Sequence, residues 1–140
     1  YQIAILSKAI SQFIRKGING EDIVLKSTGN QYYSYTYVAD AVSGLLTVLL
    51  YGQTGEAYNI ADTASDITLK DLAGLIAHVA DRKVVFENPD TLESTGYSKA
   101  TKARLDSAKL NSLGWSARYT LVEGIDKTLR ILRNSDGCCK

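Results

Sequence analysis

The residues best suited to chemistry in this sequence are Lys99, Lys102 and Arg104, which form its densest cluster of basic side chains. An ammonium or a guanidinium group can hold phosphate oxygens, and a guanidinium can do so through two parallel hydrogen bonds. The cluster lies in residues 88–105, a stretch that contains the only proline and shows no apolar periodicity. Connections of this length are uncommon in compact domains unless they are functional. A solvated basic loop is the commoner explanation for such residues, so both interpretations stay open at this point.

Side chains with the spacing needed for catalysis are absent. Short-chain dehydrogenases use Tyr-x-x-x-Lys, in which the lysine lowers the tyrosine pKa, but no tyrosine here has a lysine four residues later. The single histidine, His78, lies within an amphipathic pattern and is expected on a helix surface. Gly52 and Gly55 give the nearest match to a dinucleotide-binding turn, but the third glycine is missing. We therefore expect no catalytic residue and no bound cofactor in this chain.

Neighbouring carboxylates and adjacent cysteines are the other residues that could form a site. Glu21 with Asp22, and the segment from Asp62 to Asp66, could in principle supply an acid and a base. Both occur in turn-like sequence, where aspartate bonds to its own backbone, so we expect solvated loop charges. The two cysteines, at 138 and 139, are adjacent and almost terminal, which gives no metal-ligand spacing. We expect no metal site.

The bulk composition is that of one globular domain. The sequence has 140 residues, of which 45% are hydrophobic and 22% charged. Its formal net charge of +1 creates no global field that would attract nucleic acid or an acidic membrane surface. No apolar run is long enough to span a bilayer and no secretory signal is evident, so we expect a cytoplasmic setting. The sequence begins at Tyr1 and contains no methionine, which predicts a processed or excised chain.

Apolar periodicity predicts alternating helices and strands, and therefore an α/β fold. Helices are expected over residues 3–17, 40–50, 68–79, 106–114 and 120–132. Strands are expected over residues 23–26, 33–38, 57–61 and 83–87, and the first two could form a hairpin or lie side by side. We expect Asp40 to cap the helix that follows it. The apolar face of that helix consists of Val42, Leu45, Leu46, Leu49 and Leu50.

Four ordered stretches of the sequence resemble one known family. They are residues 13–25, residues 29–40, residues 55–60 with the helix start at 68–72, and residues 105–115 with 121–125. The second, Gly-Asn-Gln-Tyr-Tyr-Ser-Tyr-Thr-Tyr-Val-Ala-Asp, is similar to a Gly-x-Gln-x-Arg-Ser/Asp-Phe-x-Tyr-Val-x-Asp signature. In this order they resemble the C-terminal half of the extended short-chain dehydrogenases/reductases, whose members are nucleotide-sugar epimerases, 4,6-dehydratases and decarboxylases.

The resemblance implies both the architecture and the activity of a parent enzyme. Residues 1–134 would form the C-terminal α/β substrate-binding portion of a Rossmann-type extended short-chain dehydrogenase/reductase, with a flexible tail at 135–140. The N-terminal dinucleotide-binding half would be missing, and it would bind NAD. The parent would be an NAD-dependent enzyme similar to UDP-glucose 4-epimerase or dTDP-glucose 4,6-dehydratase. This fragment alone would hold the nucleotide-diphosphate sugar and would be inactive.

The resemblance also assigns substrate contacts. The strand from Val24 to Lys26 would line the nucleotide pocket, and Tyr33 would face the diphosphate. The family usually has arginine at the position of Tyr33, and tyrosine offers one hydroxyl and no charge. The family's second phosphate-binding arginine lies before its Asp-x-x-Lys helix, and Lys102 is nearest to that position, with Arg104 close by.

A second interpretation belongs to another class of protein. The chain could be a non-catalytic binding or assembly module that keeps the scaffold and has lost the ligand, since fold alone does not establish function. The missing charge at Tyr33 favours this alternative. Surfaces that would pack on an absent half would be exposed, and exposed apolar patches promote association, so a homodimer is possible.

Overall fold

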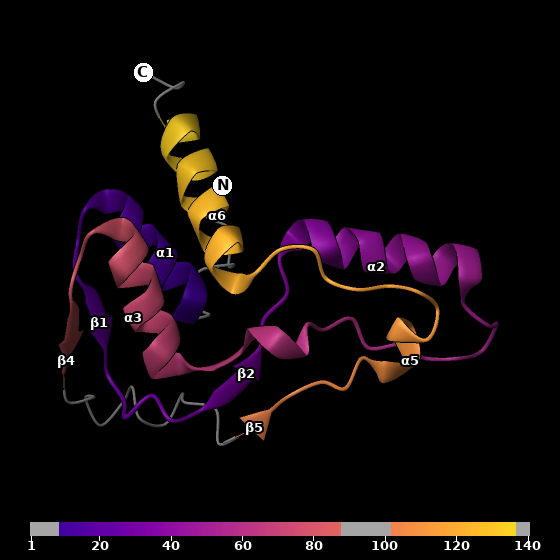
Figure 1. Ribbon diagram of the computed structural model, residues 1–140. Coiled ribbons are helices and arrows are strands. Elements are labelled where there is room, and N and C mark those ends of the chain that lie inside the picture. The colour runs from indigo at the N-terminus through magenta and orange to yellow at the C-terminus, as the bar shows by residue number, and fades with distance from the viewer. Residues whose placement is uncertain (1–8, 88–101, 137–140) are drawn as a thin grey trace.

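The computed structural model describes residues 9–87 and 102–136. Figure 1 shows the elements, which in chain order are α1 (Ala9–Asn19), β1 (Ile23–Leu25), β2 (Tyr32–Ser34), α2 (Val38–Tyr51), the 3-10 turn η2 (Thr63–Ser65), β3 (Asp66–Thr68), α3 (Leu69–Ala80), β4 (Val84–Phe86), β5 (Lys102–Ala103), α5 (Ala108–Asn111) and α6 (Leu121–Asp136). Helices and strands alternate along most of the chain. The predicted α/β class is confirmed.

The main hydrophobic core lies where α1, α3 and α6 pack together against β1. Its largest fully buried side chains include Ile23, Leu72, Ile76 and Leu129. Gly17 of α1 allows the close approach of α3, because a Cβ atom at this position would lie 3.0 Å from the Cβ of Ala80. Apolar residues at helical spacing thus give each of the three helices a face that meets the same core.

The strands form two small sheets rather than one. β1 pairs in parallel with β4, so that Ile23 lies opposite Val84. β2 is the central strand of the second sheet, antiparallel to β3 and parallel to β5. The expected pairing of residues 23–26 with 33–38 is therefore wrong, because their backbones bond to strands that come much later in the chain.

Two predicted strands also differ in extent from the structure. β2 ends at Ser34 rather than at residue 38, because Tyr37 already adopts the N-cap position of α2. Residues 57–61 pair with no strand among those that the structure describes. Aromatic and β-branched residues predicted extended backbone at both places, but such composition does not supply a pairing partner.

Polar side chains accept free backbone N–H groups at the start of three helices. The hydroxyl of Thr68 accepts the backbone N–H of Asp71 at 3.1 Å at the start of α3. Thr120 and Glu123 form a reciprocal capping box at the start of α6. Asp106 accepts the N–H of Ala108 at 2.8 Å before α5. Helix α6 continues through Asp136, while the tail boundary at residue 135 stays a prediction.

Helix α2 lies to one side of the core formed by α1, α3 and α6 (Figure 1). Its predicted apolar face is exposed, and Leu49 and Leu50 have 78% and 69% of their surface accessible. Its buried residues are instead Asp40 and Gly44. The absent Cβ of Gly44 leaves room for Ile60, whose Cγ2 would lie 2.8 Å from it. The periodicity of α2 thus marks a face that no described part of this chain covers.

Asp40 does not cap α2, contrary to the sequence-based expectation. It lies in the first turn of α2, is 1% exposed, and accepts the backbone N–H groups of Arg118 and Tyr119, each at 3.0 Å. Ser43, one turn later, accepts the indole N–H of Trp115 at 2.9 Å. These bonds tie α2 to the segment that precedes α6. The sequence offers no local signal for them, because the partners lie far along the chain.

Candidate functional site

The three-stranded sheet places basic and aromatic residues on one face and apolar residues on the other. Residues that pair across strands share a face, and successive residues alternate between faces. Tyr32 pairs with Lys102, whereas Tyr33 pairs with Ala103 and with Ile67. Ile67 packs against the hydrophobic core. Lys102 and Tyr32 therefore lie on the face that points away from the core, and Tyr33 lies on the core side.

A hydrogen-bonded network joins the three strands on this outer face. The carboxylate of Asp66 accepts the hydroxyl of Ser34 at 2.5 Å and also the Nε–H of Arg104. The hydroxyl of Ser34 in turn accepts the backbone N–H of Leu105 at 3.1 Å. The guanidinium carbon of Arg104 lies 5.6 Å from the centre of the Tyr32 ring, within the range of a cation–π contact.

The two charged members of the network differ in exposure. The side chain of Asp66 is 4% exposed, whereas that of Arg104 is 57% exposed. The hydrogen bond from Arg104 to Asp66, and then the charge of Asp66, raise the pKa of the guanidinium above its ordinary value. Arg104 therefore stays charged at any physiological pH, with an open side toward solvent.

The sequence-based expectation for Asp66 was wrong. It was expected to be a solvated turn charge, yet it belongs to β3 and its side chain is nearly inaccessible. Asp62 behaves as expected, since its carboxylate accepts the N–H of Ala64 at 3.1 Å and caps η2. Because aspartate is common in turns, the sequence did not indicate the role of Asp66. The polar–apolar–polar alternation of Asp66, Ile67 and Thr68, which is typical of a strand, was the available signal.

The substrate contacts implied by the family resemblance fall in three places. Lys102 and Arg104 lie together on the outer face of the three-stranded sheet. Tyr33 lies on the opposite face of the same sheet, with its ring 6.3 Å from that of Tyr35 in an edge-on arrangement. Val24 and Lys26 belong to β1 and its end, in the other sheet, and both are half-buried. Of the predicted substrate-contacting residues, the structure thus brings together Lys102 and Arg104.

Tyr35 lies close to the core, and its phenol is uncharged at neutral pH. Burial, and next the neighbouring Tyr33, raise the pKa of Tyr35 to about 12. Tyr35 and Tyr37 are both half-buried. Tyr35 therefore contributes packing and an uncharged hydroxyl group at neutral pH.

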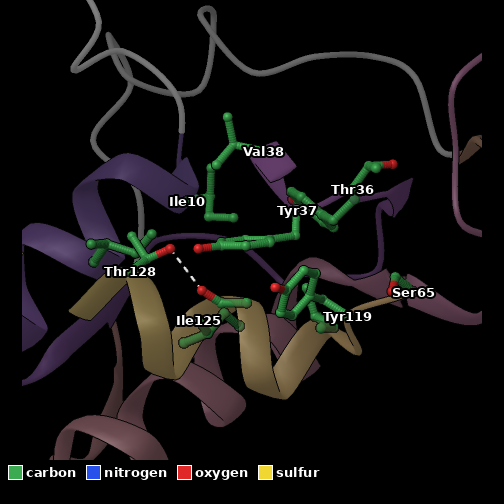
Figure 2. Close-up of a pocket in the computed structure, with 12 residues that line it drawn as sticks. Ile10, Thr36, Tyr37, Val38, Ser65, Tyr119, Ile125 and Thr128 are labelled. Carbon is green, nitrogen blue, oxygen red and sulfur yellow. Dashed lines mark hydrogen bonds between the residues drawn. The ribbon is translucent and has the colours of Figure 1, made fainter. Parts of the chain in front are cut away.

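A cavity of about 270 Å³ lies between α1, α6 and the segment that links β2 to α2. Figure 2 shows the ring of Tyr37 between Ile10 and the α6 residues Ile125 and Thr128. The rings of Tyr37 and Tyr119 are 5.0 Å apart. Thr128 donates its hydroxyl to the carbonyl of Gly124, as the dashed line marks. Among the described residues the lining contains no charged side chain, so this part of the cavity does not suit a phosphate group.

Other polar residues of the described part of the chain lie at the surface or in structural roles. His78 is exposed on α3, and Asn59 donates to the backbone carbonyl of Asp106 at 2.9 Å in a structural role. Within residues 9–87 and 102–136, no three His, Cys, Asp or Glu side chains are grouped as metal ligands. No helix in these ranges has the length and apolar character of a bilayer span. Lys99 lies outside the described residues.

Solved structures with the same arrangement define the class of protein. A UDP-glucose 4-epimerase from Thermotoga maritima, solved with UDP-glucose, matches with a TM-score of 0.75 and 24% identity, over 91% of this chain and 40% of that one. A dTDP-glucose 4,6-dehydratase from Streptomyces venezuelae, solved with NAD and TYD bound, matches with a TM-score of 0.77 and 22% identity, over 95% of this chain and 40% of that one. The fold is part of the Rossmann-type extended short-chain dehydrogenase/reductase fold.

Sequence comparisons narrow this class to a family. The profile of the NAD dependent epimerase/dehydratase family matches residues 3–61. The mouse dTDP-D-glucose 4,6-dehydratase is 30% identical over 131 residues, which are 91% of this chain and 37% of the mouse protein. These matches make the chain similar to members of the NAD-dependent epimerase/dehydratase family. It spans less than half the length of each of these relatives.

The described residues do not fit NAD, the cofactor that the family implies. A dinucleotide site needs a glycine-rich turn from a strand into a helix, so that backbone N–H groups can approach the pyrophosphate. The junction of β3 with α3 contains no glycine, and the hydroxyl of Thr68 already occupies a free N–H of that helix. The first turn of α2 carries the carboxylate of Asp40, which would repel a phosphate.

Proposed function

We propose that the chain is the nucleotide-sugar-binding part of an NAD-dependent nucleotide-sugar epimerase or dehydratase. The observation that carries the proposal is the pair of cations, Lys102 and Arg104, on one exposed face of the sheet beside the ring of Tyr32. Lys102 begins β5 and Arg104 directly follows it, and two cations at this spacing suit two linked phosphate groups. The matched relatives support the substrate class, since they include a dTDP-D-glucose 4,6-dehydratase and an epimerase solved with UDP-glucose.

The chain would contribute by positioning the substrate. Holding the diphosphate fixes the sugar relative to a cofactor that another part of the enzyme binds, and such orientation is a large component of enzymatic rate. We further propose that Val24 and Lys26 line the nucleotide pocket, whereas Tyr33, on the opposite face of the sheet from Lys102, does not take part in the diphosphate contact. In this proposal the chain by itself shows no turnover, and a cytoplasmic setting remains our expectation.

Titration with UDP-glucose and dTDP-glucose, followed by ligand-observed NMR, tests the proposal. We expect saturable binding that Lys102→Ala weakens roughly tenfold, because a charge-assisted hydrogen bond to phosphate is lost. Lys83→Ala removes an equally exposed charge outside the site and is the matched control. Equal affinities in the two variants, or no binding by the unmodified chain, would contradict the proposal.

The alternative of an assembly module draws on a different observation, the exposed apolar face of α2. We propose that a second copy of the chain covers this face, because its exposed positions carry no charged side chain and two copies can meet without burying a charge. Light scattering after size exclusion should then show a dimer that Leu49→Lys dissociates and Ile131→Lys, at an exposed site of α6, does not. A monomeric unmodified chain would contradict the homodimer and leave the face for a different polypeptide.

A further inference from the structure

Arg104 is held from two directions although its side chain is mostly exposed. The buried carboxylate of Asp66 accepts its Nε–H, and the centre of the Tyr32 ring lies 5.6 Å from the guanidinium carbon. Among the described residues, the hydrogen bond to Asp66 is the one that Arg104 makes, and it uses Nε. The two terminal nitrogens, which carry four of the five N–H donors, therefore have no acceptor in the described part of the chain.

Asp66 is in turn fixed by the strands around it. Its other carboxylate oxygen accepts the hydroxyl of Ser34, whose oxygen accepts the N–H of Leu105. These bonds join β2, β3 and the residues that follow β5. The direction in which Arg104 points is thus set by the backbone of the sheet rather than by a free side-chain rotation.

We propose that Asp66 is a positioning residue, which holds Arg104 so that its terminal nitrogens and the ammonium of Lys102 together bind the diphosphate of a nucleotide sugar. This inference rests on the proposed function and adds the residue that organises the anion site. A flexible arginine loses rotamer freedom when it binds an anion, and an arginine that is already fixed loses less. Asp66, Ser34 and Tyr32 would then act on the ligand only through Arg104.

The direction in which anion affinity changes when Asp66 is replaced separates a positioning role from a purely electrostatic effect. Asp66 carries a negative charge close to the anion site, so its removal should strengthen anion binding if charge alone matters. If Asp66 positions Arg104, its removal should weaken binding in spite of the more favourable charge. Asp66→Asn keeps the size of the side chain and removes the charge, which makes it the decisive variant.

The experiment is a double-mutant cycle on the whole chain with inorganic pyrophosphate and UDP-glucose as probes, measured by calorimetry. We expect Asp66→Asn and Arg104→Ala each to weaken binding of both probes roughly fivefold, and the double variant to be no weaker than Arg104→Ala. Unchanged or tighter binding in Asp66→Asn would overturn the inference. So would a loss that Asp66→Asn still causes in the Arg104→Ala background.

A second variant keeps the test decisive if Asp66→Asn fails to fold. Arg104→Lys, at an exposed position, retains the charge and loses the Nε–H that Asp66 holds, and we expect the same loss of affinity. Arg104→Lys with unchanged affinity would overturn the inference. In the unmodified chain, pyrophosphate should shift the NMR signals of the terminal nitrogens of Arg104 and leave its Nε–H signal protected from exchange.

The two probes separate this inference from the proposed function. UDP-glucose binding that survives both Asp66→Asn and Arg104→Ala would overturn the role of Asp66 and leave the proposed function standing. Pyrophosphate binding that depends on Asp66, without any binding of UDP-glucose or dTDP-glucose, would overturn the proposed function and leave the positioning of Arg104 intact. Lys83→Ala is the control for general charge effects in both titrations.

Discussion

Helices α3 and α2 have similar lengths, 12 and 14 residues, and both are rich in apolar side chains. α3 buries five apolar residues, namely Leu72, Ala73, Ile76, Ala77 and Ala80. α2 buries an aspartate and a glycine and exposes its leucines. An apolar helical pattern therefore shows that a face needs a partner, but it does not show that the same chain provides one.

The two helices are also held by different forces. α3 is fixed by packing, which is non-directional and grows with the apolar area removed from water. α2 is fixed by directed bonds, in which Asp40 accepts two backbone N–H groups and Ser43 accepts the indole N–H of Trp115. Substitutions on the two helices should consequently differ in how much they lower the free energy of unfolding and in which contacts they remove.

Truncation of one leucine on each helix gives the largest expected contrast. Leu72→Ala in α3 should lower the free energy of unfolding by about 2–5 kcal/mol, because the side chain is 0% exposed and leaves a cavity. Leu46→Ala in α2 should change it by less than about 1 kcal/mol, since that residue is 53% exposed. Urea unfolding followed by circular dichroism measures both. Losses of equal size would show that α2 is covered as well as α3 is.

Removal of the polar anchor of α2 should have the next largest effect. Asp40→Ala leaves the amides of Arg118 and Tyr119 without an acceptor, and we expect a loss of roughly 2–4 kcal/mol in the free energy of unfolding. The fluorescence of Trp115 should shift, because the segment that carries it is released from α2. Ser43→Ala, which removes the single bond to Trp115, should cost less. An unshifted spectrum in Asp40→Ala would argue against the anchor.

Alkaline pH should lower the free energy of unfolding through Tyr35, which packs against the core that contains α3. We expect this effect to be smaller than that of the substitutions above. The pKa of Tyr35 is raised from 10.0 to about 12. Between these values the unfolded chain has lost this proton and the folded chain keeps it, so stability is full below about pH 10 and falls as the pH rises toward 12. Tyr35→Phe should flatten the pH dependence of the urea midpoint in this window. Tyr51→Phe, on the exposed end of α2, is the matched control, and equal slopes in both variants would contradict the assignment.

Local patterns predicted the parts of the fold that depend on neighbours in sequence. The capping residues Thr68 and Thr120 begin the helices that the sequence predicted, and β1 and β4 lie where β-branched residues are concentrated. Strand partners were not predictable, because β1 pairs with β4 rather than with the nearer β2. Pairing depends on long-range contacts that a single sequence does not encode locally.

The sequence predicted the basic residues of the candidate site but not the carboxylate that holds one of them in place. Lys102 and Arg104 were found because basic residues cluster in a stretch without apolar periodicity. Asp66 was missed because an aspartate in a turn-like sequence has the same local signature whether it is solvated or buried under an arginine. Tyr33 and Lys102 lie on opposite faces of the sheet. The sequence did not predict this, because it depends on the register between β2 and β5.

The parallel pair of β1 and β4 has a consequence for how fast the chain folds. Ile23 and Val84 pair although the chain between them in sequence includes the whole of α2 and α3. The entropy of closing that long loop must be lost before the two strands gain any bonds, whereas α3 can begin at its cap without distant partners. We therefore expect the β1–β4 pair to form late, and substitutions in it to change the unfolding rate more than the folding rate.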